Sequence, residues 1–419
     1  MPNHPFNLQE RWKKQRSGKQ IIQRYAFYAL AILLLFALNL IIARNVTGGV
    51  DFYVKWGSAR IMHDGEMSVY SNAARDLLVE NAKNTIYFSL SDTTQFTTPI
   101  YTLFLYFPFA WINDFELARA LWMTICCILL VVGIQPQEKA VFQLQTKNNA
   151  TYFLIAFLIT NIFSAISIIS GDTLIIALTL VLISLKHARK GNYELAGIFC
   201  GLATIQPVLA IVWVILLGIV SIREGNWGVV VWFIISSVLL VFSGFILQAG
   251  WTVEYLQTII LAIRKIPEIL QFNSRNINQI LRLTIPLIIL IVEWVRTVSR
   301  VDRPQTNIWL FNLSLILFAI GVAPLKPEAF VLTIPAWVEI FDEWNKRQNN
   351  SAKVIGYINL SVYILFTILF IFVKPATIVN QQAISDTLLS LSSVHVLFNM
   401  YWIRGWLKQE DLKNYIEPA

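Results

Sequence analysis

One acidic residue of this chain stands where it could do chemistry. Asp51 is the first carboxylate after the long apolar segment 25–43, and only a short stretch of chain separates the two. A carboxylate placed beside an attacking hydroxyl group can take its proton and so act as a general base. We interpret Asp51 as a catalytic carboxylate at the outer face of a membrane enzyme. The alternative is a solvated carboxylate in the turn that follows a helix.

A second acidic residue lies in a comparable place. Asp172 belongs to the short turn Ser170-Gly171-Asp172 between two apolar segments. Ionisable groups among membrane helices are costly and are therefore functional candidates. Asp172 could equally be solvated, or it could cap the helix that begins at Thr173. Both explanations stay open.

The elements that must hold these carboxylates are membrane helices. Of the 419 residues, 56% are hydrophobic and only 14% are charged, whereas soluble proteins carry about 25% charged residues. The apolar segments are long and lack the alternation of barrel strands. We therefore expect an all-α, polytopic integral membrane protein with a single transmembrane domain over residues 1–419. The apolar segments are approximately 25–43, 96–112, 117–134, 151–169, 173–186, 191–206, 207–222, 228–248, 277–295, 308–324, 328–341, 354–373 and 386–403.

The basic loops set the predicted topology. The basic tail 1–24 belongs in the cytoplasm, and the loop Lys186–Lys190 belongs on the same side. This arrangement requires that Phe96–Ile112 does not cross the membrane. Its residues Pro99 and Pro108 fit a juxtamembrane or re-entrant helix. About 12 transmembrane helices remain, and both termini are predicted to be cytoplasmic, with the chain in the cell membrane.

Two long polar segments then lie on the outer side. These are the loops 44–116 and 249–276, and each carries amphipathic stretches. Such stretches are typical of juxtamembrane helices that lie on the membrane surface.

Charge, cysteine and histidine content exclude several other classes of protein. The net charge of +8 comes with basic residues in short loops between apolar segments, as expected for a membrane protein, so no nucleic acid partner is predicted. The cysteines lie inside apolar segments and no histidines pair at ligand spacing. We predict no cofactor and no metal-binding residue, although a metal ion is not excluded.

A series of short motifs resembles a known group of enzymes. In chain order they are Asp51, Gly65, Tyr70, Thr97-Thr98-Pro99, Tyr106-Phe107-Pro108-Phe109, Leu117–Trp122, Ser170-Gly171-Asp172, Arg189-Lys190-Gly191, Ala196-Gly197 and Gln206-Pro207. Over roughly residues 20–340 the chain resembles the GT-C superfamily of polyprenyl-phosphate-dependent glycosyltransferases, most of all glycosyltransferase family 87. It departs from that family at Asp172, Gln206 and Thr98, where the family commonly has Gln, Lys and Pro.

The resemblance implies a reaction that fits a single carboxylate. It implies inverting transfer of a mannose-like sugar, or of another hexose or pentose, from a polyprenyl phosphate to a hydroxyl group of a glycan or glycolipid acceptor. A lipid phosphate is already a good leaving group, so one base suffices, whereas glycosidases use two carboxylates. Asp51 would be that base, at the outer face of the bilayer.

The same resemblance places other residues in the site. The lipid phosphate needs cations on the outer side, and the candidates are Arg119, Lys326 and Arg282. Each of these could instead extend to lipid headgroups. The candidate substrate-binding residues are Asp172, Gln206, Tyr53, Trp56, Tyr70 and Asn276. The three aromatic residues could equally belong to the belt found at membrane interfaces.

Two other functions stay open. A transporter or flippase-like permease would bury ionisable residues near the bilayer midplane and use broken helices. A non-catalytic relative would bind a lipid-linked sugar or a partner without turnover, and the departures at Asp172 and Gln206 keep this reading open.

Overall fold

The computed structural model describes most of the chain. The described residues are 8–65, 67–82, 95–134, 161–264, 274–298, 304–322, 327–346, 350–373 and 379–416. Within these ranges the chain forms α-helices and short 3-10 helices and no strand, so the prediction of an all-α fold is confirmed. The helices are α1 (Leu8–Asn45), α2 (Val50–Asp64), α3 (Asn72–Ala82), η1 (Ile100–Leu105), α4 (Phe107–Ala110), α5 (Phe115–Ile134), α7 (Ile162–Ser170), α8 (Leu174–Arg189), α9 (Tyr193–Leu202), η2 (Ala203–Ile205), α10 (Pro207–Arg223), α11 (Gly228–Leu247), α12 (Trp251–Arg264), α14 (Ser274–Val298), α15 (Pro304–Val322), η3 (Pro327–Thr333), α16 (Ile334–Lys346), α17 (Asn350–Val373) and α18 (Val379–Ile416).

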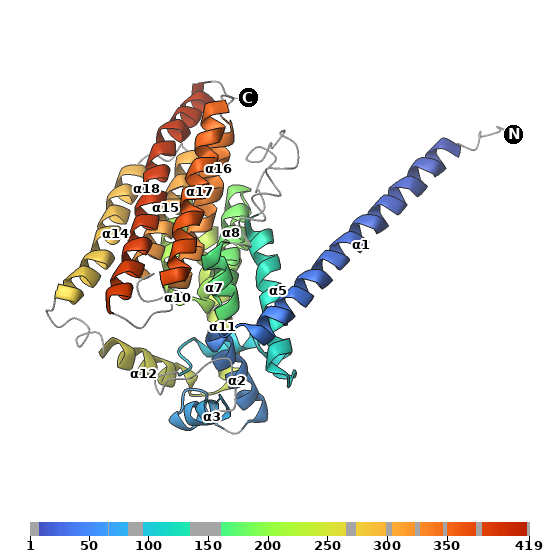
Figure 1. Ribbon diagram of the computed structural model, residues 1–419, viewed down its shortest axis with the longest axis vertical. Coiled ribbons are helices and arrows are strands. Elements are labelled where there is room, and N and C mark those ends of the chain that lie inside the picture. Colours follow the sequence, from blue (N-terminus) through green and yellow to red (C-terminus); the bar gives the residue numbers. More distant parts are fainter. Residues whose placement is uncertain are drawn as a thin grey trace.

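Most of the long helices run side by side along the longest axis of the molecule (Figure 1). The short helices α2 and α3, together with α12, gather at one end of this bundle. Helix α1 leaves the bundle at an angle, and its first turns point toward the same end as the last turns of α18. The first turns of α1 and the last turns of α18 therefore both lie far from α2 and α3.

Three described helices are long and apolar enough to cross a membrane. They are Tyr25–Asn45 within α1, Phe115–Ile134 and Gly228–Leu247. The pair α7 and α8 makes a fourth if it counts as one span, although its halves meet at 115°. A membrane protein is thus supported, but the count of about 12 spans is not confirmed. The reason is length, because several predicted segments form apolar helices of only 10–17 residues.

The prolines of the predicted juxtamembrane segment shape it as expected. Phe96–Ile112 forms the 3-10 helix η1 and the single-turn helix α4, not one straight span. Pro99 precedes η1 and Pro108 lies in the first turn of α4, where a missing N–H group does little harm. Its position at a membrane surface stays a prediction.

Aromatic packing fixes α2 against this segment and against α5. Phe52 is fully buried, and its ring centroid lies 5.6 Å from Trp122 and 5.9 Å from Tyr106. The rings of Tyr106 and Trp122 stack at 4.4 Å. Aromatic pairs of this kind contribute about 0.5–1.5 kcal/mol each beyond the area they bury. The helix that carries Asp51 is therefore held on a rigid aromatic base.

Helix α2 differs in one respect from its predicted form. The amphipathic pattern predicts a helix lying on a surface, yet residues 52–59 and Ile61 are all buried. Helix α3, segment 95–112 and the start of α5 enclose it, since Tyr53 contacts Leu78 and Trp56 contacts Phe109. Tyr53, Lys55 and Trp56 of α2 therefore have hydrogen-bond partners within the protein.

A partly buried ion pair ties α18 into the bundle. Arg404 of α18 donates to both carboxylate oxygens of Glu293 on α14, at 3.1 and 2.6 Å. The same guanidinium lies over the ring of Trp309 on α15, 4.6 Å from its centroid. Two-pronged geometry is the strongest form of an arginine–carboxylate contact, and here it joins three helices.

Candidate functional site

Asp51 lies in the first turn of α2, two residues after Gly49, which caps the helix with a φ of 91°. It is half-buried, whereas the residues that follow it are buried. A carboxylate in a first turn also interacts favourably with the helix dipole, by about 0.3–1 kcal/mol. The negative charge of Asp51 thus stabilises the start of α2, and this contribution is compatible with a role as a general base.

One turn farther along the same face of α2, Lys55 makes a buried ion pair. Its Nζ lies 3.3 Å from Oδ1 of Asp172, and the two side chains are 7% and 2% exposed. The pairing joins residues 117 positions apart. A buried charge needs a partner and further hydrogen bonds, and Asp172 has both.

Two further donors complete the surroundings of Asp172. Gln206 donates from Nε2 to Oδ1 of Asp172 at 3.0 Å and to Oγ1 of Thr173 at 2.6 Å. The backbone N–H of Thr173 donates to Oδ1 of Asp172 at 2.7 Å. The structure therefore brings together the predicted pair Asp172 and Gln206. This contact is not a helix cap, because Thr173 is itself the N-cap residue of α8 and no side-chain capping hydrogen bond is made there.

The break between α7 and α8 positions Asp172. Gly171 ends α7 with a φ of 77°, a conformation that favours glycine. A Cβ atom on Gly171 would lie 2.3 Å from the Cβ of Phe52. Only a residue without a side chain lets the break approach the first turn of α2 so closely. That approach puts Asp172 within reach of Lys55.

Tyr106 lies near enough to both carboxylates to feel their charges. Burial raises the pKa of Tyr106 well above its ordinary value, and the nearby charges of Asp172 and Asp51 raise it further. Its hydroxyl group therefore stays protonated and donates to the backbone oxygen of Gly171 at 3.4 Å. The Nζ of Lys55 lies 5.9 Å from the centre of the Tyr106 ring.

Arg119, predicted to bind a lipid phosphate, contacts backbone instead. Its side chain is fully buried, and it donates to the carbonyl oxygens of Ala43, Val46 and Ile169 at 3.1–3.3 Å. These contacts hold the end of α1 and the end of α7 against α5. Arg119 thereby anchors the chain just before Asp51, and a contact with a phosphate stays a prediction.

The three candidate aromatic residues also donate hydrogen bonds to backbone oxygens within the protein. Tyr53 donates to the carbonyl oxygen of Leu78 at 3.2 Å, Trp56 to that of Phe109 at 2.9 Å, and Tyr70 to that of Thr98 at 2.8 Å. All three are buried in protein. Successive residues turn by about 100° around a helix, so Tyr53 and Trp56 point away from the face of Asp51 and Lys55. A sugar stacked on these rings would not lie beside Asp51.

The side chains of the remaining candidates lie outside the described part of the structure. Lys326 lies outside the described residues. Arg282 and Asn276 belong to α14, but their side chains are outside the described part.

The two predicted outer loops meet in a second polar cluster. Ser68, between α2 and α3, donates to Glu254 of α12. Gln248, which follows α11, donates to Ser68 at 2.8 Å and to Glu254 at 2.7 Å. The loops 44–116 and 249–276 are therefore joined at the end of the bundle that carries Asp51.

Two residues of the site were missed from the sequence. Lys55 is not among the predicted site residues, although its place four residues after Asp51 puts it on the same helix face. Tyr106 is predicted only as part of the motif Tyr106-Phe107-Pro108-Phe109. The signal for Lys55 was a cation within an aromatic stretch, but its partner could not be read from local spacing.

The chain matches no protein-family model and no curated protein. Among the residues that the structure describes, no three side chains of histidine, cysteine, aspartate or glutamate are grouped so that they could hold a metal ion.

Proposed function

We propose that this chain is a membrane glycosyltransferase of the GT-C type, similar to glycosyltransferase family 87, that uses Asp51 as its general base. The observation that supports this most is the contrast between its two neighbouring carboxylates. Asp172 is 2% exposed and paired with Lys55, so it is poorly placed to exchange a proton. Asp51 is half-buried on the same helix face, so the residue is partly accessible.

The reaction follows from the chemistry of the proposed donor. A sugar bonded to a polyprenyl phosphate is attacked at its anomeric carbon by a hydroxyl oxygen of the acceptor. As the new carbon–oxygen bond forms, Asp51 takes the hydroxyl proton and the bond to the phosphate oxygen breaks. The polyprenyl phosphate leaves with the electron pair, and the configuration at carbon is inverted. The donor would come from the bilayer and the acceptor would be a glycan or glycolipid, with the spans numbering about 12 and both termini cytoplasmic.

The test uses the full chain in proteoliposomes. Dolichyl and undecaprenyl phosphate mannose and glucose serve as labelled donors, and a total glycolipid extract serves as the acceptor. We expect labelled product from the wild type and a fall of about 10²–10⁴-fold in Asp51→Asn, the usual contribution of a general base.

The matched control is Asp76→Asn, because Asp76 is an exposed carboxylate on α3. This variant should transfer at the wild-type rate. A folded Asp51→Asn protein that also transfers at the wild-type rate would rule out Asp51 as the base.

The broken helix pair favours a second candidate, a permease. The halves of α7 and α8 meet at 115°, and the buried Lys55–Asp172 pair lies beside the break. Discontinuous helices with ionisable groups at the break form the substrate sites of many transporters. In this case Asp172→Asn would abolish uptake of a labelled lipid-linked sugar into proteoliposomes, Asp51→Asn would not, and no new glycosidic product would form.

A further inference from the structure

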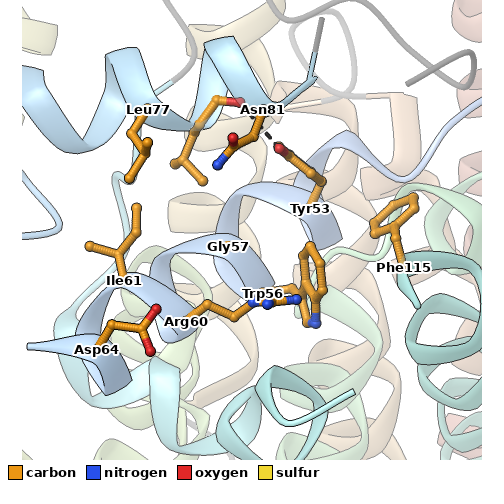
Figure 2. A pocket seen from close by; sticks show the side chains of 10 residues that line it. Tyr53, Trp56, Gly57, Arg60, Ile61, Asp64, Leu77, Asn81 and Phe115 are labelled. Carbon is orange, nitrogen blue, oxygen red and sulfur yellow. Dashed lines mark hydrogen bonds between the residues drawn. The ribbon is translucent and has the colours of Figure 1, made fainter. Parts of the chain in front are cut away.

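A pocket lies between α2 and α3, on the side of α2 that faces away from Asp51. Its volume is about 360 Å³, within the range of roughly 300–1,000 Å³ that is usual for ligand sites. Figure 2 shows α3 forming one wall and α2 the other. The lining residues are Tyr53, Trp56, Gly57, Arg60, Ile61, Asp64, Leu77, Leu78, Asn81 and Phe115.

The floor of the pocket is fixed before any ligand arrives. Tyr53 and Trp56 are held by hydrogen bonds to backbone oxygens, and the ring of Phe115 lies 5.5 and 5.6 Å from theirs. A Cβ atom on Gly57 would lie 2.4 Å from Leu78, so glycine at this position allows α2 and α3 to approach closely. A preformed floor lowers the entropy that binding must overcome.

The rim of the pocket is polar and balanced in charge. Arg60 contributes one positive charge and Asp64 one negative charge, while Asn81 is neutral. Asp64 and Asn81 are exposed. Arg60 donates to Asn113 at 3.2 Å, and its guanidinium lies 4.9 Å from the ring centroid of Trp56. An anion such as a phosphate would meet the carboxylate of Asp64 as well as the guanidinium, so a neutral ligand fits better.

These features together match a carbohydrate. A pyranose ring has an apolar face of C–H groups and a rim of hydroxyl groups that both donate and accept hydrogen bonds. The aromatic floor suits the apolar face of the ring, and the planar polar groups of Arg60, Asp64 and Asn81 suit its hydroxyl groups. We propose that the pocket between α2 and α3 binds one ring of a neutral glycan, at a site separate from Asp51.

That this glycan belongs to the acceptor rests on the proposed function. The pocket and Asp51 lie on opposite faces of one helix, so a sugar ring bound in the pocket is not the ring that reacts beside Asp51. It would instead hold a part of the acceptor that is remote from the reacting hydroxyl group. Such remote contacts raise affinity for the correct acceptor and leave the chemical step to Asp51.

The experiment measures sugar binding without any reaction. The full chain is placed in phosphatidylcholine nanodiscs, because a maltoside detergent would itself present a sugar. The probes are the methyl glycosides of mannose, glucose, galactose and N-acetylglucosamine, together with mannotriose and cellotriose. Binding is followed by saturation-transfer NMR. The blocking variant is Asn81→Trp and its matched control is Glu80→Trp, since both positions are exposed on α3 and only Asn81 lines the pocket.

We expect saturable binding of at least one probe by the wild type. Asn81→Trp should weaken that binding by at least about tenfold, while Glu80→Trp and Asp51→Asn should leave it within about twofold. Three results would overturn the assignment: no probe binds, the blocking variant binds as the wild type does, or inorganic phosphate displaces the sugar.

The two proposals can fail separately. If sugar binding is found and Asp51→Asn still transfers sugar normally, the base is wrong and the pocket stands. If Asp51→Asn abolishes transfer and no probe binds, the proposed function stands and the pocket is wrong.

Discussion

The buried Lys55–Asp172 pair makes the sharpest prediction about how this fold is held together. Replacing lysine by methionine in Lys55→Met keeps a side chain of similar shape and removes the charge. Asp172 would then keep the donors Gln206 and Thr173 and lose the cation that lies 3.3 Å from its Oδ1. The buried carboxylate would lose the positive charge that it pairs with in the wild type.

The size of the effect follows from the distance. At 3.3 Å and an effective dielectric constant of about 20, two unit charges attract each other by about 5 kcal/mol. Removing one partner of a buried pair costs about 3–5 kcal/mol. We therefore expect Lys55→Met to lower the free energy of unfolding by about 3–5 kcal/mol. The double variant Lys55→Met/Asp172→Asn should recover most of this loss, because the asparagine oxygen still accepts from Gln206 and Thr173.

The assay is a double-mutant cycle. The wild type, both single variants and the double variant are unfolded with SDS in mixed micelles and followed by circular dichroism. A coupling energy of about 2 kcal/mol or more between the two sites is expected, within the range for residues in contact. A double variant whose loss equals the sum of the single losses would refute the reasoning, as would a loss below about 1 kcal/mol in Lys55→Met.

Two further predictions concern local structure. Gly171→Ala should lower the free energy of unfolding by at least about 2 kcal/mol, because φ is positive and the new Cβ would meet Phe52 at 2.3 Å. Gly65→Ala should lose only about 1–2 kcal/mol, because φ is also positive there but no atom lies within 4 Å of the new Cβ. Equal losses for the two variants in the same SDS titration would show that the contact with Phe52 is unimportant. Asp114→Ala should cost about 0.5–2 kcal/mol at neutral pH, since Asp114 accepts from the backbone N–H of Leu117 at the start of α5. Hydrogen bonds, first from the Glu116 side chain and then from Leu117, lower the pKa of Asp114, so this stabilisation should be full above the unfolded pKa of about 3.9 and lost as the pH falls through the lowered folded pKa. If the difference in the free energy of unfolding between wild type and Asp114→Ala grew as the pH fell, the ionised Asp114 carboxylate would not be the source of the stabilisation.

Composition and long apolar runs were enough to predict an all-α membrane protein. They also located Tyr25–Asn45, Phe115–Ile134 and Gly228–Leu247 within a few residues, because a helix that is apolar all round needs no tertiary partner to be recognised. The prolines of Phe96–Ile112 predicted its irregular form for the same local reason.

The contacts inside the site could not be predicted in the same way. Lys55 and Asp172 meet only because Gly171 lets the α7–α8 break approach α2, and no local pattern encodes that approach. Arg119 has the right charge for a phosphate, yet its guanidinium is directed to backbone oxygens. A single sequence shows the type of a side chain and not the direction in which the fold points it.

The anchoring of α1 has a consequence for how the protein would tolerate different bilayers. This helix has 38 residues, about 57 Å at 1.5 Å per residue, and only 11% of its apolar window is buried. Arg119 secures its last turn. In a thicker or thinner hydrocarbon layer, α1 could therefore tilt about that secured end. The geometry around Asp51 would then not change with the thickness of the bilayer.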